Sequence, residues 1–242
     1  MSEKVYPVLM YHSICKMPKG TPMRSLHVPS VLFRLHMRTL KFLGYKGISM
    51  SELLPYLKGE KTGKVVGITF DDGYLNNLQN ALPILKEFKF SATCYLLSEN
   101  INGNNYWDLN KGIPELKTMS AKNVREWISS GMEIGSHGKH HLHLSQLSES
   151  DAKKEIMESK ADLEKNFGCP VLHFCYPFGD FNYSTLDIVK SSGYATATTV
   201  SRGRALKGGN LFQIPRIFIT HRTFLHLFLL KLFTRYEDRK KE

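Results

Sequence analysis

Short runs of apolar, β-branched or aromatic residues alternate along the chain with segments in which apolar residues recur every three or four positions. The first pattern predicts buried strands, and the second predicts amphipathic helices. Strands are expected at residues 8–11, 65–70, 93–97, 132–135, 171–175, 195–200 and 217–219. Because strands that alternate with helices form parallel sheets, seven or eight such repeats predict an α/β protein with a (β/α) barrel.

Three of the expected helices carry start and stop signals. A serine that can cap the first turn precedes each apolar pattern, and a glycine that tolerates positive φ follows it. The serines are Ser30, Ser120 and Ser150, and the glycines are Gly44, Gly131 and Gly168. Residues 98–118 are rich in Asn, Gly and Pro and predict a long loop over one face, a length that favours a functional role.

Composition narrows the class of protein. The 242 residues are 42% hydrophobic and 23% charged, which is typical of a globular chain, and no linker or repeat interrupts the single domain expected over residues 1–242. The net charge is +11, but the basic residues are dispersed along the chain and form no nucleic-acid-binding motif. Nucleic acid is therefore not an expected partner. The opening residues show no secretion signal, and the four cysteines form no C-x-x-C pair, which together predict a cytoplasmic location.

The strand expected at residues 65–70 runs directly into two acids and a glycine, Asp71, Asp72 and Gly73. At the carboxyl end of a barrel strand such side chains point into the active-site mouth, where one carboxylate can bind a metal and the other accept a proton. The structural alternative is a turn, because Asp-Asp-Gly favours turns and aspartate can cap the following helix.

Four histidines lie within seven residues after the strand expected at residues 132–135. Imidazole is a common zinc ligand, and a catalytic zinc site has three protein ligands and one open position. His137 and His141 can share one ion if the loop between them makes a helix-like turn, with His140 and His143 as rival ligands. The isolated histidines, which are expected to serve packing or to lie at the surface, are His27, His36 and His226.

Three further segments place candidate residues near the same mouth. His12 follows the first strand, and Phe178 belongs to an aromatic Pro-Gly turn that follows the strand at 171–175. Arg216 lies beside the last strand.

The ordered set of segments 69–73 (TFDDG), 136–144 (SHGKHHLHL) and 176–179 (YPFG) resembles the polysaccharide deacetylase family, the NodB-homology domain. The positions of His12, before the Asp-Asp motif, and of Arg216, late in the chain, resemble the circularly permuted branch of the family. In that branch the histidine that acts as general acid precedes the Asp-Asp motif. The resemblance covers nearly the whole chain. It implies a deformed (β/α) barrel and metal-dependent hydrolysis of the N-acetyl group of an amino sugar.

The resemblance also implies a metal site. Asp72, His137 and His141 would bind one divalent ion, expected to be zinc, with cobalt or nickel as alternatives. Such an ion polarises the acetyl carbonyl and lowers the pKa of the attacking water.

The same resemblance assigns the proton chemistry. Asp71 would be the base and His12 the acid that protonates the departing amine. The backbone N–H of Phe178 would help to hold the oxyanion. Unpermuted members carry an arginine in the third motif that orients the base; residues 174–179 have none, so this role falls to Arg216.

Residues 222–235 predict an amphipathic helix rich in Phe and Leu, followed by a charged tail that ends at Glu242. With basic flanks, this helix can lie in a membrane interface, or it can pack on the core as other barrel helices do. With this helix, its basic charge and no secretion signal in its opening residues, the chain resembles deacetylases of polyprenyl-phosphate-linked amino sugars. A lipid-linked N-acetylamino sugar and peripheral contact with the inner membrane face are therefore expected.

Two alternatives stay open at this level. The substrate can instead be an exopolysaccharide or cell-wall polymer, which would require an export route. The chain can also be a catalytically silent sugar-binding relative, although the candidate acids and histidines are all retained together.

Overall fold

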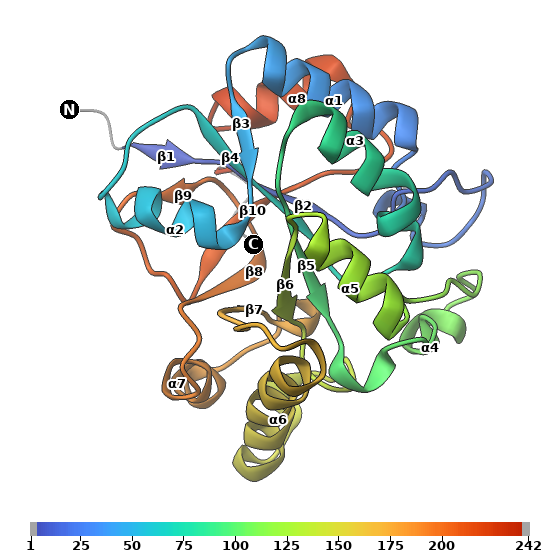
Figure 1. Ribbon diagram of the computed structural model, residues 1–242, viewed down its shortest axis with the longest axis vertical. Helices are drawn as coiled ribbons and strands as arrows, with labels where there is room; N and C mark the ends of the chain where they lie inside the picture. The colour runs from blue at the N-terminus through green and yellow to red at the C-terminus, as the bar shows by residue number, and fades with distance from the viewer. Residues whose placement is uncertain (1–3, 239–242) are drawn as a thin grey trace.

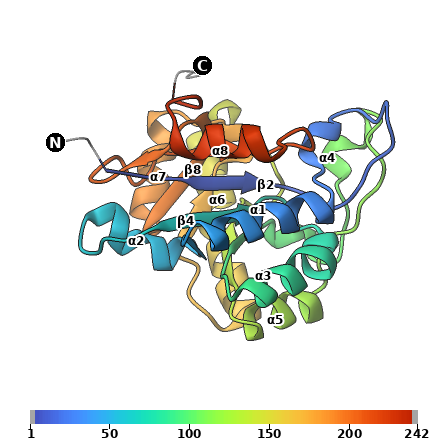
Figure 2. The same cartoon turned by 90° about the horizontal axis from the view of Figure 1, so that it is seen from above.

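The computed structural model describes residues 4–238, in which strands and helices alternate (Figures 1 and 2). The strands are β1 Val5–Tyr6, β2 Val8–Tyr11, β3 Lys46–Ile48, β4 Val65–Phe70, β5 Thr93–Leu96, β6 Glu133–Ser136, β7 His173–Cys175, β8 Thr196–Arg202, β9 Ala205–Leu206 and β10 Ile214–Phe218. The α-helices are α1 Ser30–Phe42, α2 Met50–Lys58, α3 Leu82–Phe88, α4 Tyr106–Leu109, α5 Ala121–Ser129, α6 Glu149–Phe167, α7 Tyr183–Ser191 and α8 Leu225–Phe233.

Seven parallel strands close into a ring in the order β2-β10-β8-β7-β6-β5-β4, and β4 pairs back with β2. The closing register places Val8 opposite Gly67 and Tyr11 opposite Phe70. β3 pairs with the first half of β4, and β1 forms a separate antiparallel pair with β9. The expected deformed (β/α) barrel is confirmed.

The seven strands of the ring are those predicted from the apolar runs, with ends shifted by a few residues. β4 is buried at all six positions, because parallel barrel strands face the interior on one side and helices on the other. Gly67 allows this close packing: a Cβ there would lie 2.9 Å from the side chain of Leu53 in α2. β1, β3 and β9, with two or three residues each, are too short to produce a sequence pattern.

The predicted helix starts are partly confirmed. Ser120 caps α5, as expected. The cap of α6 is Ser148 rather than Ser150, because the Ser148 hydroxyl accepts the N–H of Asp151 at 3.1 Å. Ser30 is the first residue inside α1, directly after Pro29, and makes no cap hydrogen bond.

The predicted long loop, residues 98–118, contains α4 and is held by bridges between Asn104 and Lys117 and between Tyr74 and Thr118. Figure 2 shows α4 on the side toward which the arrow of β2 points. The loop therefore lies at the carboxyl ends of the strands.

The C-terminal helix α8 lies within the predicted range 222–235 and packs beside α1 (Figure 2). The ring of Phe228 is fully buried and stacks on His36 of α1, with centroids 4.1 Å apart. Phe224 and Phe233, in contrast, are 57% and 42% exposed. One side of the helix is therefore core, and the other is apolar and accessible; residues 239–242 of the predicted tail lie outside the described residues.

No helix within residues 4–238 has both the length and the apolar content that a membrane-spanning segment requires.

Candidate active site

The strand ends bring the predicted site residues together at one edge of the barrel. His12 follows β2, Asp71 and Asp72 follow β4, and His137 follows β6. Arg216 projects from the middle of β10, two strands away from β7 in the ring. All except His12 are buried, so the site is built into the fold rather than placed on a surface loop.

Asp72, His137 and His141 form a compact group of potential metal ligands. Oδ1 of Asp72 lies 3.4 Å from Nε2 of His137 and 3.4 Å from Nε2 of His141. A tetrahedral ion with ligand bonds of about 2.0–2.1 Å holds its ligand atoms roughly 3.3–3.4 Å apart. Two imidazole nitrogens and one carboxylate oxygen therefore fit a zinc-like ion and leave its fourth position open.

Neighbouring groups orient both histidines. Nδ1 of His137 donates to the carbonyl oxygen of Cys175 at 2.7 Å, which fixes the ring with its Nε2 directed at Asp72. The ring of His141 is stacked against Trp107, with centroids 4.6 Å apart, and meets the edge of Phe178 at 4.3 Å. The loop at residues 98–118 thus contributes directly to the site through Trp107.

Three site residues have a strained backbone. Asp72, His141 and Phe178 have φ values of 71°, 56° and 58°, in the left-handed region that side chains with a Cβ rarely adopt. Each such residue costs on the order of 1–3 kcal/mol and persists only where the surrounding structure holds it. Strain of this kind concentrates at functional sites, which favours the functional interpretation of Asp71-Asp72-Gly73 over a simple turn.

The electrostatics of the group suit a cation. Burial alone would raise the pKa of Asp72, but hydrogen bonds from His137 and His141 outweigh it and hold this pKa well below its usual range. Burial lowers the pKa of His141. Burial acts in the same direction at His137, but Cys175 and Asp72 outweigh it and raise the pKa of His137 well above its usual range, so a metal ion would displace a proton from this imidazole. An ionised carboxylate and a neutral imidazole are the forms that bind a metal ion.

Asp71 is held by Arg216 rather than by the ligand group. Two guanidinium nitrogens of Arg216 donate to the two carboxylate oxygens at 2.7 and 2.8 Å. Arg216 is itself fixed by Thr69 Oγ1 at 3.1 Å and by the carbonyl of Thr199 at 2.9 Å. Burial would raise the pKa of Asp71, but the charge and hydrogen bonds of Arg216 lower it, so this carboxylate is ionised at neutral pH.

His12 also approaches Asp71. Its Nε2 is 3.8 Å from Oδ2 of Asp71, and its Nδ1 has no hydrogen-bond partner within the described part of the chain. Asn77 fixes the backbone here by donating to the carbonyl of His12 at 2.8 Å. An imidazole with unused hydrogen-bonding capacity beside the site can exchange a proton with a substrate.

The rival ligands are engaged elsewhere. His140 pairs with Glu155, and His143 stacks on Phe178 with centroids 4.1 Å apart. A second group of possible ligands, Asp71 with His137 and Cys175, is occupied by Arg216, whose guanidinium also lies 3.3 Å from the Cys175 sulfur. A fixed positive charge at that position would repel a metal ion.

The isolated histidines are separate from the ligand group. His36 is buried between the hydroxyl of Tyr11 at 3.0 Å and the carbonyl of Thr223 at 2.7 Å, which is a packing role. His226 is exposed on α8.

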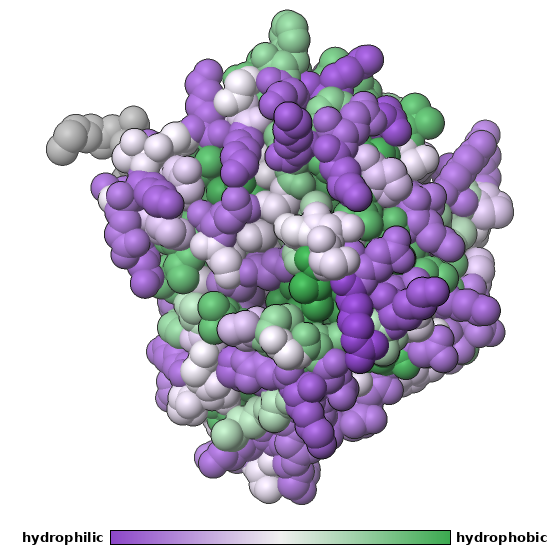
Figure 3. Space-filling view, in the orientation of Figure 1, coloured by the Kyte–Doolittle hydropathy of each residue, from purple (hydrophilic) through white to green (hydrophobic). Residues whose placement is uncertain are grey.

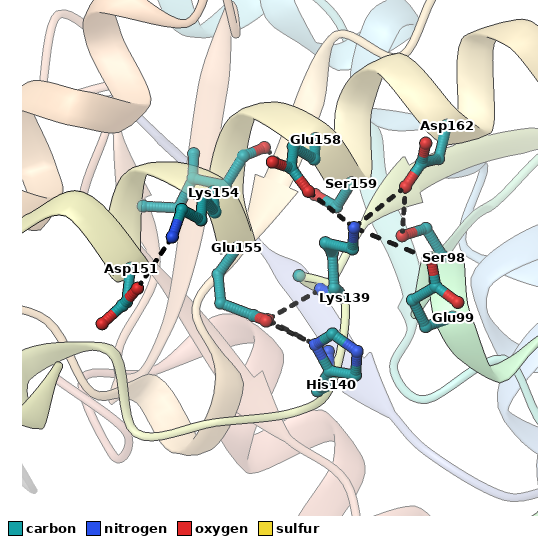
Figure 4. Close-up of polar contacts among 12 residues, drawn as sticks. Ser98, Glu99, Lys139, His140, Asp151, Lys154, Glu155, Glu158, Ser159 and Asp162 are labelled. Carbon is teal, nitrogen blue, oxygen red and sulfur yellow. Dashed lines mark hydrogen bonds and ion pairs between the residues drawn. The ribbon is translucent and has the colours of Figure 1, made fainter.

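Glu155 of α6 is a site residue that the sequence analysis missed. One of its oxygens accepts the backbone N–H groups of Lys139 and His140, both at 3.0 Å, and the other pairs with the His140 ring (Figure 4). The side chain of Lys139 meets a separate acid, Glu158, at 2.7 Å. A glutamate among the buried positions of α6, next to Ile156, was the available signal.

Residues 58–197 match the family model described as polysaccharide deacetylase. The chain belongs to the polysaccharide deacetylase family. It is accordingly a carbohydrate N-deacetylase, a hydrolase that cleaves amide bonds. The match does not extend to His12 or Arg216, which are placed in the site by the structure alone.

Relatives of this family resemble the chain over most of its length. A poly-β-1,6-N-acetyl-D-glucosamine N-deacetylase of Staphylococcus aureus is 28% identical over 205 residues, 81% of this chain and 68% of the relative. The solved structure of the Streptococcus pyogenes deacetylase PplD in complex with acetate has a TM-score of 0.83 and 26% identity, covering 96% of this chain and 99% of that one. The solved structure of a Bacillus cereus polysaccharide deacetylase has a TM-score of 0.81 and 28% identity, covering 95% of this chain and 69% of that one.

Proposed function

We propose that this polysaccharide deacetylase is metal-dependent and removes N-acetyl groups from the amino-sugar units of a polymer. The observation that carries the proposal is the position of Asp72 Oδ1, 3.4 Å from both His137 Nε2 and His141 Nε2, with the ionised Asp71 as the adjacent residue. A divalent ion held by these three residues would polarise the acetyl carbonyl and acidify the attacking water.

Asp71 is the proposed general base. Its two hydrogen bonds to Arg216 fix the carboxylate plane and keep it ionised, so it can accept a proton from water near neutral pH. Arg216 is the proposed positioning residue for this base, because it is fully buried and contacts Asp71 through both terminal nitrogens.

His12 is the proposed general acid. Its Nε2 lies 3.8 Å from Oδ2 of Asp71, and its side chain is partly accessible, so it can reach the nitrogen of the departing amine. Phe178, at the rim beside His141, would present its backbone N–H to the developing oxyanion.

A polymer of N-acetylglucosamine is the substrate we favour, because the S. aureus relative carries that substrate in its name and aligns over 81% of this chain. The aromatic wall supports a sugar ligand: Trp107 and Phe178 both flank His141. Aromatic faces pack well against the apolar faces of sugar rings while the ring edges stay hydrated.

An isoprenoid-phosphate-linked amino sugar is the second candidate. It is favoured by a groove beside the His12 end of the site that is lined by Arg24, Arg38 and Arg222 together with Phe224. Guanidinium groups recognise phosphate, and an apolar wall suits a lipid chain.

One experiment separates these possibilities. Purified protein, stripped by a chelator and reloaded with zinc, cobalt or nickel, is incubated with three panels: N-acetylglucosamine oligomers, nucleotide-linked sugars and lipid-linked sugars. Mass spectrometry then detects loss of an acetyl group. Metal-dependent release from oligomers supports the polymer assignment, and faster release from the lipid-linked panel selects the second candidate. Full activity after stripping, or in Asp72→Ala, contradicts metal dependence.

A further inference from the structure

Basic residues occur throughout the chain, but acidic residues are missing from two segments. Residues 4–51 contain eight Lys and Arg residues and no Asp or Glu, and residues 221–235 also contain no Asp or Glu. These two segments include α1 and α8, which lie side by side in the fold (Figures 1 and 2). Arg34, Arg38 and Lys41 lie on α1, and Arg222 lies shortly before α8. Lys231 of α8, in contrast, is buried and paired with Glu237. The basic side chains of the α1/α8 face therefore come mainly from α1 and the segments that precede the two helices.

The same face exposes large apolar side chains. Val31 of α1 is 80% exposed, and Phe224, directly before α8, is 57% exposed. Apolar side chains also appear between hydrophilic ones along the upper edge of Figure 3, where α1 and α8 lie. Single exposed apolar residues are ordinary, but a group of them flanked by charge marks an interaction surface.

A groove of about 760 Å³ runs between the start of α1 and the start of α8. Its apolar lining is Pro29, Val31, Leu32, Leu35 and Phe224, and its basic lining is Arg24, Arg34, Arg38 and Arg222 together with His221.

Most of the arginines in this groove lack a carboxylate partner. Arg34 pairs with Glu87 of α3. Among residues 4–238, no carboxylate oxygen lies within 4.0 Å of a guanidinium nitrogen of Arg24, Arg38 or Arg222. Three guanidinium groups without a counter-ion in the fold, grouped around an apolar groove, are complementary to phosphate groups above an apolar layer.

The groove lies beside the active site. One wall is attached just after β2 and His12, where the N–H of Val28 donates to the carbonyl of Ser13 at 2.9 Å. The other is attached where the N–H of Ile219 donates to the carbonyl of Met10 at 3.2 Å, and the ring of Phe218 contacts His12. Both walls therefore follow directly from the strands that hold His12.

We infer that the α1/α8 face docks onto a negatively charged phospholipid membrane. Phe224 and Val31 enter the interface, while Arg24, Arg38 and Arg222 contact lipid phosphates. Basic residues beside exposed aromatic and aliphatic side chains are the pattern of interfacial binding, and buried Phe228 on the inner side anchors the helix to the barrel. Docking in this way brings the His12 side of the active site to the membrane surface. This inference does not depend on the proposed substrate.

Vesicle binding tests the inference without measuring catalysis. The full chain is mixed with vesicles of pure phosphatidylcholine, with vesicles that contain phosphatidylglycerol, and with inorganic phosphate alone. We expect sedimentation with the phosphatidylglycerol vesicles, loss of binding at high salt, and no sedimentation with phosphatidylcholine. Equal binding to both vesicle types, no vesicle binding at all, or binding of inorganic phosphate in place of vesicles would overturn the inference.

Matched variants locate the surface. Each basic residue at an anionic membrane contributes about fivefold in affinity, so Arg38→Gln combined with Arg222→Gln should weaken vesicle binding on the order of 25-fold. Phe224→Ser should weaken it at least about tenfold. The controls are Lys122→Gln with Lys153→Gln, on the exposed faces of α5 and α6, and Tyr183→Ser, a 90% exposed aromatic.

Control variants should bind vesicles like the wild type, and all variants should keep their thermal unfolding midpoints. An equal loss in the lysine control would show that overall charge, and not the α1/α8 face, carries the binding, which overturns the inference. Activity on a short soluble oligosaccharide, measured in parallel, reports separately on the proposed function.

Discussion

Both carboxylate oxygens of Asp71 accept hydrogen bonds from Arg216, at 2.7 and 2.8 Å, in the interior of the barrel. The two residues are 145 positions apart in the sequence and come from β10 and from the end of β4. The barrel must therefore be closed before the proposed base acquires its orientation and its charge.

Asp71→Asn tests the base. The amide has nearly the same shape but cannot accept the proton, so we expect the rate to fall on the order of 10²–10⁴-fold while the metal content stays unchanged. Metal analysis and single-turnover rates on the same preparation check this. A variant that keeps the wild-type rate would remove Asp71 from the mechanism.

Arg216→Lys tests the positioning of the base. Lysine keeps a positive charge but loses the paired hydrogen bonds, so the pKa of Asp71 should rise and the acid limb of the rate should move to higher pH. The pH profile of kcat/KM measures this shift. Arg204→Lys, which alters an arginine–carboxylate pair with Asp238 outside the site, is the control and should leave the profile in place.

The ligand group predicts a selective loss of metal. Asp72→Asn, His137→Ala and His141→Ala should each lose most bound zinc, because each removes one of three protein ligands. His143→Ala is the matched control, since His143 stacks on Phe178 and lies outside the ligand group. Elemental analysis after dialysis decides the assignment, and metal loss in the His143 variant alone would contradict it.

Glu155 predicts an indirect effect on metal affinity. Glu155→Gln should loosen the turn from His137 to His141 and weaken zinc binding about 10–100-fold, as partners of ligand loops commonly do. The measurement is competition with a coloured chelator. Glu158→Gln, three residues further along the same helix, alters a contact with the Lys139 ammonium instead of the backbone N–H groups of the loop and should bind zinc normally.

The lowered pKa of Glu133 predicts that the free energy of unfolding decreases in acid. Burial would raise its pKa, but His173, Ser51 and Thr93 lower it from 4.5 to about 2. In acid, the Glu133 carboxylate binds a proton in the unfolded chain before it does so in the folded one. Its contribution to the free energy of unfolding is therefore complete above pH 4.5 and declines as the pH falls toward 2. It amounts to at most about 3 kcal/mol.

Urea unfolding at several pH values checks this expectation. Glu133→Gln should be less stable than the wild type at pH 7, and the difference should shrink below about pH 4. Glu126→Gln, an exposed control on α5, should follow the wild type throughout. A difference between Glu133→Gln and wild type that is the same at pH 7 and pH 3 would contradict the titration of Glu133.

The strands of the barrel and the residues at their ends were predictable because burial on both faces produces continuous apolar runs. Asp72 and His137 follow such runs directly, so their meeting at one edge is a consequence of parallel pairing. The backbone strain at Asp72 and His141 leaves no trace in the hydrophobic pattern of the sequence, so only the structure reveals it.

Contacts between distant segments were not predictable in the same way. Glu155 reaches the histidine loop only because α6 packs against it, and a glutamate in a helix ordinarily faces water. The two sides of α8 are a similar case: composition indicates an apolar helix, but only packing against His36 shows that Phe228 is core while Phe233 is accessible.

Because Trp107 stacks on His141, the surface that segment 98–118 offers to a glycan is tied to the position of a candidate metal ligand. The segment from 98 to 118 can change its outer surface to suit a different glycan, but the side that covers the imidazole must stay flat and apolar. Divergence of this segment is therefore limited by the need to keep the imidazole in place. A new specificity can arise at its outer edge without any change in the barrel beneath.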